Sequence, residues 1–304
     1  MPVAALQVGR AAGLAAIGLA ALGVAGCGSS GSSGPSPSTT THAAGHRARQ
    51  AQAGAAAGAL VAPAHPAARS VRVPILTYHR VHAYATELTK SIPDLTVEPG
   101  TFYAEMTALK DAGYHSISIR QLFDALFGGA ALPSRPVLIS VDDGYVDDVK
   151  TILPALRQLG LRATFFVITG RFAEPGFVNQ DQVRQLAAAG MDVADHTLSH
   201  VDLRTQSHDA LTAQVAGSRR TLESVLGHPV AAFAYPFGTF NDAVVAQVRR
   251  AGFALAMTTQ GGTTASSRAP LTIPRIHVGR AETPSGLLSV LGGSASAPSG
   301  GAGG

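Results

Sequence analysis

The sequence predicts an α/β fold, a single distorted (β/α) barrel. Between about residues 71 and 291, short apolar runs alternate with longer amphipathic runs. This alternation is typical of parallel strands that are joined by helices. No glycine-rich phosphate-binding turn follows the first apolar run, and polar residues suited to chemistry follow several of the other runs. These two observations favour a barrel over an open, doubly wound sheet.

Eight short β-prone runs are the expected strands. They are residues 73–78, 115–119, 137–141, 163–168, 191–194, 231–235, 253–257 and 272–277. Six longer runs are the expected helices: 102–112, 121–127, 149–159, 180–189, 210–226 and 243–251. Five of these helices are followed by a glycine that suits a left-handed C-cap: Gly113, Gly160, Gly190, Gly227 and Gly252. Asn241 and Asp242 suit the N-cap of the last helix.

The composition allows a sizeable folded domain. The chain has 304 residues, of which 46% are hydrophobic and 14% are charged, so a large core can form. The formal net charge is +4, and the basic residues are scattered along the chain. We therefore expect no nucleic-acid partner. The pattern leaves the oligomeric state open, and a monomer is our expectation.

The N-terminal residues have the pattern of a lipoprotein signal peptide. Arg10 is the only basic residue before the apolar stretch 11–26, which is too short to span a membrane comfortably. Val24-Ala25-Gly26-Cys27 resembles the bacterial lipobox, and Cys27 is the only cysteine. We expect residues 1–26 to be removed and Cys27 to carry a lipid that anchors the protein to the outer face of the bacterial cell membrane. The alternative is an ordinary signal peptide that contains a cysteine.

Two segments of biased composition flank the predicted domain, residues 71–291. Residues 27–70 are rich in Gly, Ser, Pro, Thr and Ala and lack large apolar side chains, so we expect a flexible linker. Residues 292–304 have a similar composition and are expected to form a disordered tail.

Two polar clusters follow expected strands and suit metal chemistry. In residues 140–144, Asp142 and Asp143 end a buried apolar run, where two carboxylates are costly unless something binds them. His196 and His200 are four residues apart, so on one helical turn they would face the same way and could share a metal. Each cluster alone has an ordinary explanation, as a loop opening or a surface pair. Together, two imidazoles and one carboxylate form a ligand set that leaves metal positions open.

Further candidate residues lie at the ends of other expected strands. Residues 233–238 contain Tyr235 and Phe237, and residues 273–277 contain Arg275 and His277. Tyr235 suits either the core or a platform for a sugar.

Two more polar residues lie beside these candidates. His79 follows the first expected strand and suits either the lining of a groove or a supporting role in the fold. Asp195 precedes His196 and is expected either to orient that ligand or to face solvent.

These clusters, in this order, resemble the polysaccharide deacetylases of carbohydrate esterase family 4, the NodB-homology domain. The first motif of that family, Thr-Phe-Asp-Asp-Gly, corresponds to residues 140–144, and the second, His-Ser/Thr-x-x-His, to residues 196–200. Tyr78-His79-Arg80-Val81 is similar to the branch that contains exported poly-N-acetylglucosamine deacetylases. The resemblance covers about residues 73–290 and implies a barrel of the NodB type.

The later motifs depart from the family pattern. The third motif usually begins with an arginine that braces the catalytic aspartate, and this position is Ala234 here. The fourth motif usually contains a tryptophan, and this chain has none. The fifth motif, usually Leu-x-His, is Arg275-Ile276-His277. We expect Arg275 to supply the bracing charge that Ala234 cannot.

The resemblance implies a set of roles for the site. Asp143, His196 and His200 would hold one divalent metal, with Zn²⁺ expected and Co²⁺, Ni²⁺ or Fe²⁺ also compatible. Asp142 would be the general base for a metal-bound water, and His277 the general acid for the departing amine. The oxyanion would rest on the metal and on a backbone N–H near Phe237.

The expected activity is removal of N-acetyl groups from an N-acetylglucosamine polymer at the cell envelope, including peptidoglycan. Two other functions stay open. An O-acetyl polysaccharide esterase would use the same metal chemistry and would need less help from an acid. A non-catalytic carbohydrate-binding module on the same fold is favoured by Ala234 and by the missing tryptophan, whereas the intact carboxylate and histidine clusters argue against it.

Overall fold

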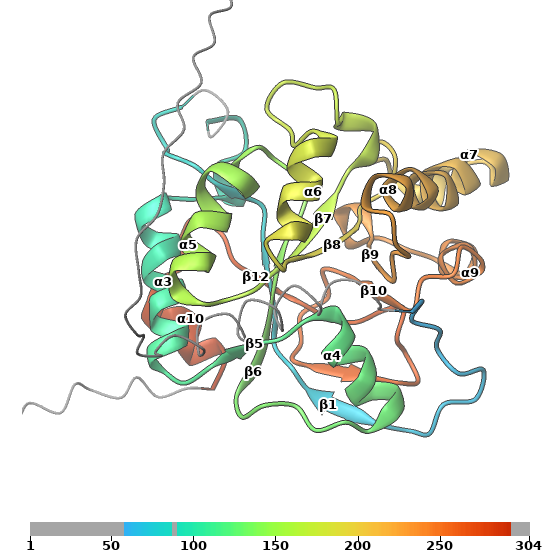
Figure 1. Ribbon diagram of the computed structural model, residues 1–304, viewed down its shortest axis with the longest axis horizontal. Helices are drawn as coiled ribbons and strands as arrows, with labels where there is room; N and C mark the ends of the chain where they lie inside the picture. Colours follow the sequence, from blue (N-terminus) through green and yellow to red (C-terminus); the bar gives the residue numbers. More distant parts are fainter. Residues whose placement is uncertain (1–57, 87–89, 293–304) are drawn as a thin grey trace, which may run out of the picture. The chain divides into compact units, whose positions relative to one another are not determined.

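Seven strands form the wall of a barrel, and neighbouring strands in this wall run parallel (Figure 1). In spatial order they are β10 (Leu255–Met257), β9 (Ala232–Ala234), β8 (Asp192–Asp195), β7 (Thr164–Val167), β6 (Pro136–Val141), β2 (Ile75–Tyr78) and β12 (Ile276–His277). Ile273, which precedes β12, bridges Met257 of β10, so the segment 273–277 links the two edges of the curled sheet. The predicted barrel is confirmed.

These observations come from a computed structural model that describes residues 58–86 and 90–292. All described residues belong to one compact unit. Cys27 and residues 1–26 lie outside the described residues, as do residues 293–304 of the expected tail. Within the described part of the chain, no helix is long and apolar enough to cross a membrane.

Successive side chains of the wall strands point alternately into two apolar clusters, as the two-residue period of a strand requires. Side chains that point into the barrel include Ile75, Leu138, Phe166, Ala194 and Ala234. Their immediate neighbours point outward under the helices and include Leu76, Ile139, Phe165, Val193 and Phe233. Both faces of β2, β6, β7, β9 and β10 are therefore buried, which explains why these strands are almost continuously apolar.

Helices surround this wall, and all six expected helices are present (Figure 1). They are α3 (Pro99–Asp111), α4 (Ile119–Phe123), α5 (Leu153–Leu159), α6 (Gln180–Ala188), α7 (His208–Thr212) with α8 (Ser218–Leu226), and α9 (Asp242–Arg250). One π-helical turn joins α7 to α8, and others follow α4 and precede α5. The five predicted C-cap glycines have φ between 70° and 87°, and the side chain of Asn241 accepts a hydrogen bond from the N–H of Val244.

Two expected strands are reduced to two residues each, for local reasons. The run 115–119 is strand only at β5 (His115–Ser116), because Ser118 and Gln121 form a capping box that starts α4 at Ile119. The run 272–277 is strand only at β12, because Pro274 has no N–H to offer a neighbouring strand.

Several elements were not predicted. β1 (Ser70–Arg72) pairs antiparallel with β11 (Thr264–Ser266), and β3 (Arg80–Val81) pairs with β4 (Thr96–Val97). A further helix, α10 (Pro284–Val290), packs beside α3. The hydroxyl of Ser267 donates a hydrogen bond to the carbonyl of Ala67 and accepts one from the N–H of Arg69. The chain is therefore held against the domain a few residues before the predicted end of the linker.

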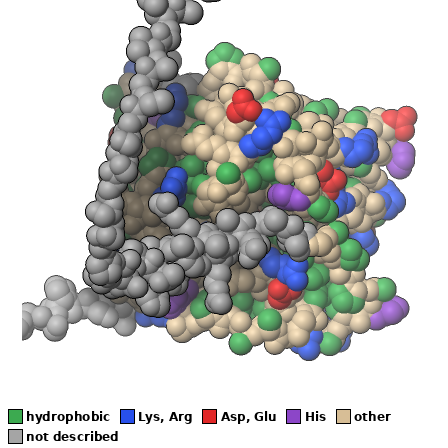
Figure 2. All heavy atoms as spheres, in the orientation of Figure 1, with side chains coloured by type: hydrophobic (Ala, Val, Ile, Leu, Met, Phe, Trp, Pro, Cys, Tyr) green, Lys and Arg blue, Asp and Glu red, His purple; other side chains and the backbone are tan. Residues whose placement is uncertain are grey.

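Charged side chains are interspersed on the face shown in Figure 2, where Lys and Arg alternate with Asp and Glu. This distribution agrees with the scattered basic residues of the sequence.

Candidate active site

The candidate residues gather at the carboxyl end of the barrel. Asp142 and Asp143 follow β6, His196 follows β8, and His277 ends β12. His79 follows β2, the strand between β6 and β12. Because all these strands are parallel, their carboxyl ends meet on one side, where the active sites of such barrels form.

Asp143, His196 and His200 form a group that could hold a metal ion. The Nε2 atoms of His196 and His200 each lie 3.4 Å from Oδ1 of Asp143, and the three ligand atoms lie within 4.8 Å of one another. Oδ1 of Asp143 is buried and has no hydrogen-bond partner in the described part of the chain. A buried oxygen without a partner is costly, so the donor set fits a divalent cation placed between the three atoms.

The backbone around this group is strained. Five non-glycine residues among those described have positive φ, and four of them lie at the site: Asp143 (77°), Thr197 (71°), His200 (54°) and Phe237 (58°). Such conformations cost energy and concentrate at functional sites. The histidine pair also differs from the expectation, because residues 196–200 form a loop rather than a helical turn. The rings of His196 and His200 are brought together by the left-handed backbone at Thr197 and His200, and not by the spacing of a helix.

Asp195 holds the loop of residues 196–200 through hydrogen bonds of its buried side chain. It is fully buried, and its carboxylate accepts hydrogen bonds from the N–H of Thr197 (2.8 Å) and from the hydroxyl of Ser218 (2.7 Å). Thr197 in turn accepts a hydrogen bond from the N–H of His200 at its hydroxyl. Asp195 therefore acts on the loop backbone, and neither of the two hydrogen bonds goes to the ring of His196.

The ring of His196 is oriented by the barrel. Its Nδ1 donates a hydrogen bond to the carbonyl of Ala234 (2.8 Å), which leaves Nε2 free to face Asp143. Burial opposes protonation of His196, but Asp143 and Asp142 outweigh it and raise the pKa of His196. For His200, burial and the neighbouring His196 lower the pKa to about 4.

Arg275 binds Asp142 across the inside of the barrel. Its Nη1 and Nη2 donate to the two carboxylate oxygens at 2.8 and 2.7 Å, and both side chains are almost fully buried. Nε of Arg275 donates to the carbonyl of Thr258 and Nη1 also to the hydroxyl of Ser140. Burial raises the pKa of Asp142, but Arg275 outweighs it, so this pKa is lower than usual.

Two histidines from neighbouring strands lie against each other, His79 after β2 and His277 at the end of β12. The ring centroids of His79 and His277 are 5.7 Å apart. His277 is exposed, whereas Nδ1 of His79 is buried without a hydrogen-bond partner among the described residues. Burial lowers the pKa of His79, although the charges of Asp142 and Asp143 oppose this effect.

Phe237 and Tyr235 have different surroundings. Phe237 is 59% exposed, and its ring lies 4.6 Å from that of His200. Tyr235 is fully buried, and its hydroxyl donates to the carbonyl of Leu271. Tyr235 is therefore a core residue, which is one of its two expected placements, and its buried ring offers no surface to a sugar.

Sequence reasoning missed Tyr145. This residue directly follows Asp142-Asp143-Gly144, and burial together with the charge of Asp143 raises the pKa of its phenol to about 12. Its place next to the two carboxylates was the signal that could have identified it.

Comparison with known proteins agrees with this geometry. Residues 129–256 match the family model for polysaccharide deacetylase. This chain carries a polysaccharide deacetylase domain. The deacetylase PplD of Streptococcus pyogenes, solved in complex with acetate, superposes on it with a TM-score of 0.69 and 29% sequence identity, over 73% of this chain and 99% of that one.

Two further relatives extend the likeness beyond the matched residues. The Bacillus subtilis protein YxkH, whose name assigns it to the polysaccharide deacetylases, is 24% identical over 210 residues, 69% of this chain and 72% of the relative. The poly-beta-1,6-N-acetyl-D-glucosamine N-deacetylase of Staphylococcus aureus is 22% identical over 225 residues, 67% of this chain and 77% of the relative. The deacetylase domain thus has relatives along most of the described chain.

Proposed function

We propose that this protein is a metal-dependent hydrolase that removes N-acetyl groups from an N-acetylglucosamine polysaccharide. The observation that carries the proposal is the convergence of Asp143, His196 and His200 next to Asp142, which Arg275 binds through two hydrogen bonds. The substrate class is supported by relatives named as deacetylases of poly-N-acetylglucosamine, peptidoglycan and chitooligosaccharide.

Asp143, His196 and His200 would hold the metal, for which we propose Zn²⁺. Two imidazole nitrogens and one carboxylate oxygen are a common zinc ligand set and leave coordination positions open. When bound, such an ion polarises the acetyl carbonyl and lowers the pKa of a water molecule. The hydrogen bond from His196 to Ala234 would keep the ring in the orientation that presents Nε2.

Asp142 would be the general base. The low pKa that Arg275 imposes keeps its carboxylate ionised near neutral pH, so it can accept a proton from the attacking water. Arg275 holds both carboxylate oxygens, which fixes the direction in which Asp142 points.

His277 would donate a proton to the departing amine. An amine leaves readily only after protonation, so the reaction needs an acid as well as a base. His277 is exposed, whereas His79 is largely buried, which disfavours a charged imidazole at His79. His79, which lies against His277, would line the site.

The turn at Phe237 would stabilise the negative charge that develops on the acetyl oxygen. Its left-handed backbone places this residue beside His200, and a backbone N–H near such an oxygen lowers the barrier. Its exposed ring would form part of the wall of the site.

We also propose that the protein is exported and anchored by a lipid on Cys27 to the outer face of the cell membrane. The apolar stretch 11–26 and the sequence Val24-Ala25-Gly26-Cys27 support this proposal. Mass spectrometry of the N-terminal peptide from the membrane fraction tests it. A Cys27→Ser variant that stays in the membrane fraction to the same extent as the parent would contradict it.

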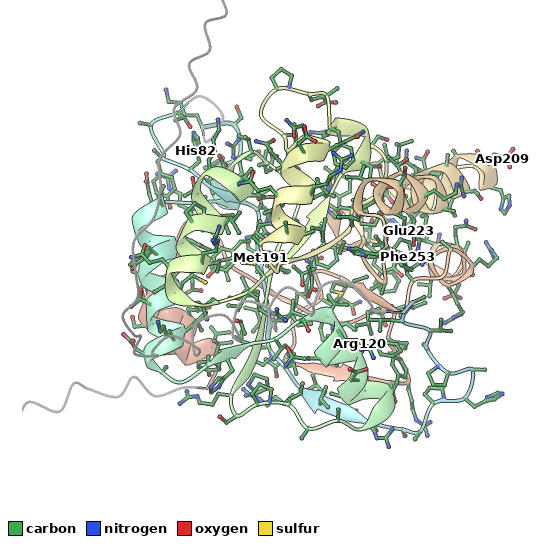
Figure 3. All side chains as sticks on the ribbon, viewed as in Figure 1. His82, Arg120, Met191, Asp209, Glu223 and Phe253 are labelled. Carbon is green, nitrogen blue, oxygen red and sulfur yellow. The ribbon has the colours of Figure 1, made fainter. Side chains whose placement is uncertain are left out.

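Acetate release tests the proposed activity. Full-length protein is incubated with defined N-acetylglucosamine oligomers and with peptidoglycan, with and without a chelator. We expect release that the chelator stops and that zinc restores. Asp142→Asn should abolish release, whereas Asp209→Asn, which changes an exposed carboxylate on α7 (Figure 3), should not. No release from any of these substrates by folded, zinc-loaded protein would overturn the proposal.

A further inference from the structure

A stack of four side chains lies beside Asp143. The rings of Tyr145 and Phe177 are stacked, with centroids 4.8 Å apart and an angle of 26° between their planes. The guanidinium of Arg80 lies 4.5 Å from the centre of the Tyr145 ring, and that of Arg171 lies 4.6 Å from the centre of the Phe177 ring. Two aromatic rings are thus combined with two cations, and each contact is favourable.

The backbone pins the same two segments together. Tyr145 and Phe177 form an antiparallel bridge, the N–H of Val146 donates to the carbonyl of Gly176 (2.8 Å), and the N–H of Val178 donates to the carbonyl of Gly144 (2.9 Å). The loop that carries Asp143 is therefore fixed to residues 176–178. A left-handed residue such as Asp143 persists only where its surroundings hold it in this way.

Arg80 anchors the inner end of the stack. It is almost fully buried, and its Nε donates to Oδ2 of Asp147 at 2.9 Å. Nδ1 of His82, labelled in Figure 3, donates to the other carboxylate oxygen of Asp147 at 2.9 Å. Asp147 lies four residues after Asp143, so the same loop is held at both ends.

We propose that Tyr145 is a positioning residue for Asp143, and that the stack of Arg80, Tyr145, Phe177 and Arg171 sets the metal affinity of the site. Tyr145 lies two residues after Asp143, in a loop that the bridge to Phe177 holds in place, and the charge of Asp143 acts on its phenol. Oδ1 of Asp143 faces the two histidines and has no hydrogen-bond partner among the described residues. A donor on the other carboxylate oxygen would turn Oδ1 towards the metal. This inference rests on the proposed metal centre. It adds Tyr145 as the residue that orients the carboxylate of one proposed ligand, Asp143.

Tyr145→Phe tests the hydroxyl and leaves the stacked ring in place. Zinc affinity is measured on the full-length protein by competition with a chromophoric chelator. We expect Tyr145→Phe to bind zinc about tenfold more weakly, as is typical when a partner of a metal ligand is lost. Its melting temperature without metal should stay close to that of the parent. Its activity should fall at limiting zinc and recover when zinc is in excess.

Two further variants serve as controls. One tests the stacking of the Tyr145 ring separately from its hydroxyl, and the other tests whether loss of a tyrosine hydroxyl elsewhere affects zinc affinity. Phe177→Leu keeps the Tyr145 hydroxyl but removes its stacking partner, and we expect a smaller loss of zinc affinity. Tyr103→Phe removes a hydroxyl from a partly exposed residue of α3 and should leave zinc affinity unchanged.

The outcomes distinguish this inference from the proposed function. If the parent binds zinc no better than His196→Ala, the metal centre and the inference both fail. If the parent binds zinc and Tyr145→Phe binds it equally tightly, only the inference fails, even if the melting temperature falls, because the stack would then be purely structural.

Discussion

The guanidinium of Arg275 and the carboxylate of Asp142 meet inside the barrel through two hydrogen bonds of 2.7 and 2.8 Å. Arg275 comes from the segment that closes the barrel, and Asp142 from the end of β6 on the far side of β2. Ala234, which stands where the family usually has its bracing arginine, is small and belongs to the inner apolar cluster. Arg275 therefore supplies a positive charge to the Asp142 carboxylate from a different strand than the one that carries Ala234.

Arg275→Lys should lower kcat while the protein stays folded. Lysine keeps the positive charge but cannot offer two parallel donors to the carboxylate. Loss of one charge-assisted hydrogen bond is worth about 1.5–3 kcal/mol, which corresponds to a roughly 10-fold to 100-fold slower reaction. Acetate release at saturating substrate measures the change.

The matched control for this variant is Arg268→Lys, an exposed arginine, which should behave like the parent. Arg275→Ala is a stricter test, although it leaves Asp142 buried without a partner and can cost about 3–5 kcal/mol of stability. Unchanged turnover in a folded Arg275→Ala protein would show that Arg275 does not brace the base.

Zinc should stabilise the protein against unfolding. A ligand that binds only the folded state adds about 2.7 kcal/mol to the free energy of unfolding at a free concentration one hundred times its Kd. Thermal unfolding with and without zinc measures this effect. His196→Ala should lose the stabilisation, whereas His208→Ala, an exposed histidine on α7, should retain it. Equal stabilisation of the two variants would place the zinc elsewhere.

Local signals explain why so much of this site could be predicted from the sequence. Parallel strands that are buried on both faces leave apolar runs, and the first polar residues after each run lie at one end of the barrel. Asp142, Asp143, His196 and His277 were identified in this way. Their positions depend on strand periodicity, which is visible over a few residues.

The remaining features depend on contacts between distant residues. The pairing of Ser70 with Ser266 joins positions almost two hundred residues apart, and no local sequence pattern predicts it. The stack of Tyr145 on Phe177 is of the same kind. Helix α10 differs from these features, because Thr283 as N-cap and Pro284 after it are local signals that indicate the start of a helix.

Stability should depend on pH through Glu105. This buried residue of α3 accepts a hydrogen bond from the hydroxyl of Tyr78, and burial raises its pKa to about 7, above the usual value of 4.5. The negative charge of Glu282 contributes in the same direction. The folded state therefore holds a proton that the unfolded state has lost. Its contribution to stability is complete below about pH 4.5 and disappears as the pH rises through 7.

Glu105→Gln should remove this dependence, because the amide oxygen can still accept from Tyr78 and carries no charge. Urea unfolding between pH 5 and 8 measures it, with Glu174→Gln, an exposed residue, as the control. We expect the free energy of unfolding to fall less with pH in Glu105→Gln than in the parent. Parallel curves for the two proteins would show that Glu105 is ionised throughout this range.

His79 and His277, which lie against each other, should differ in their effect on amide and ester substrates. An amine leaving group needs a proton from the enzyme, whereas an alkoxide leaving group needs less help. His277→Ala should therefore slow release of acetate from an N-acetylated oligomer by about 10²-fold to 10⁴-fold, and from an O-acetylated one by much less.

His79→Ala is the informative companion, because its ring lies 5.7 Å from that of His277 and is more buried. If His79 only lines the site, its loss should weaken binding of both substrates to a similar degree and change KM more than kcat. The reverse result, with the amide-specific loss of kcat in His79→Ala and a tolerant His277→Ala, would assign the acid to His79. The proton would then come from the buried member of the pair, and exposure would be a poor guide to the donor at this site.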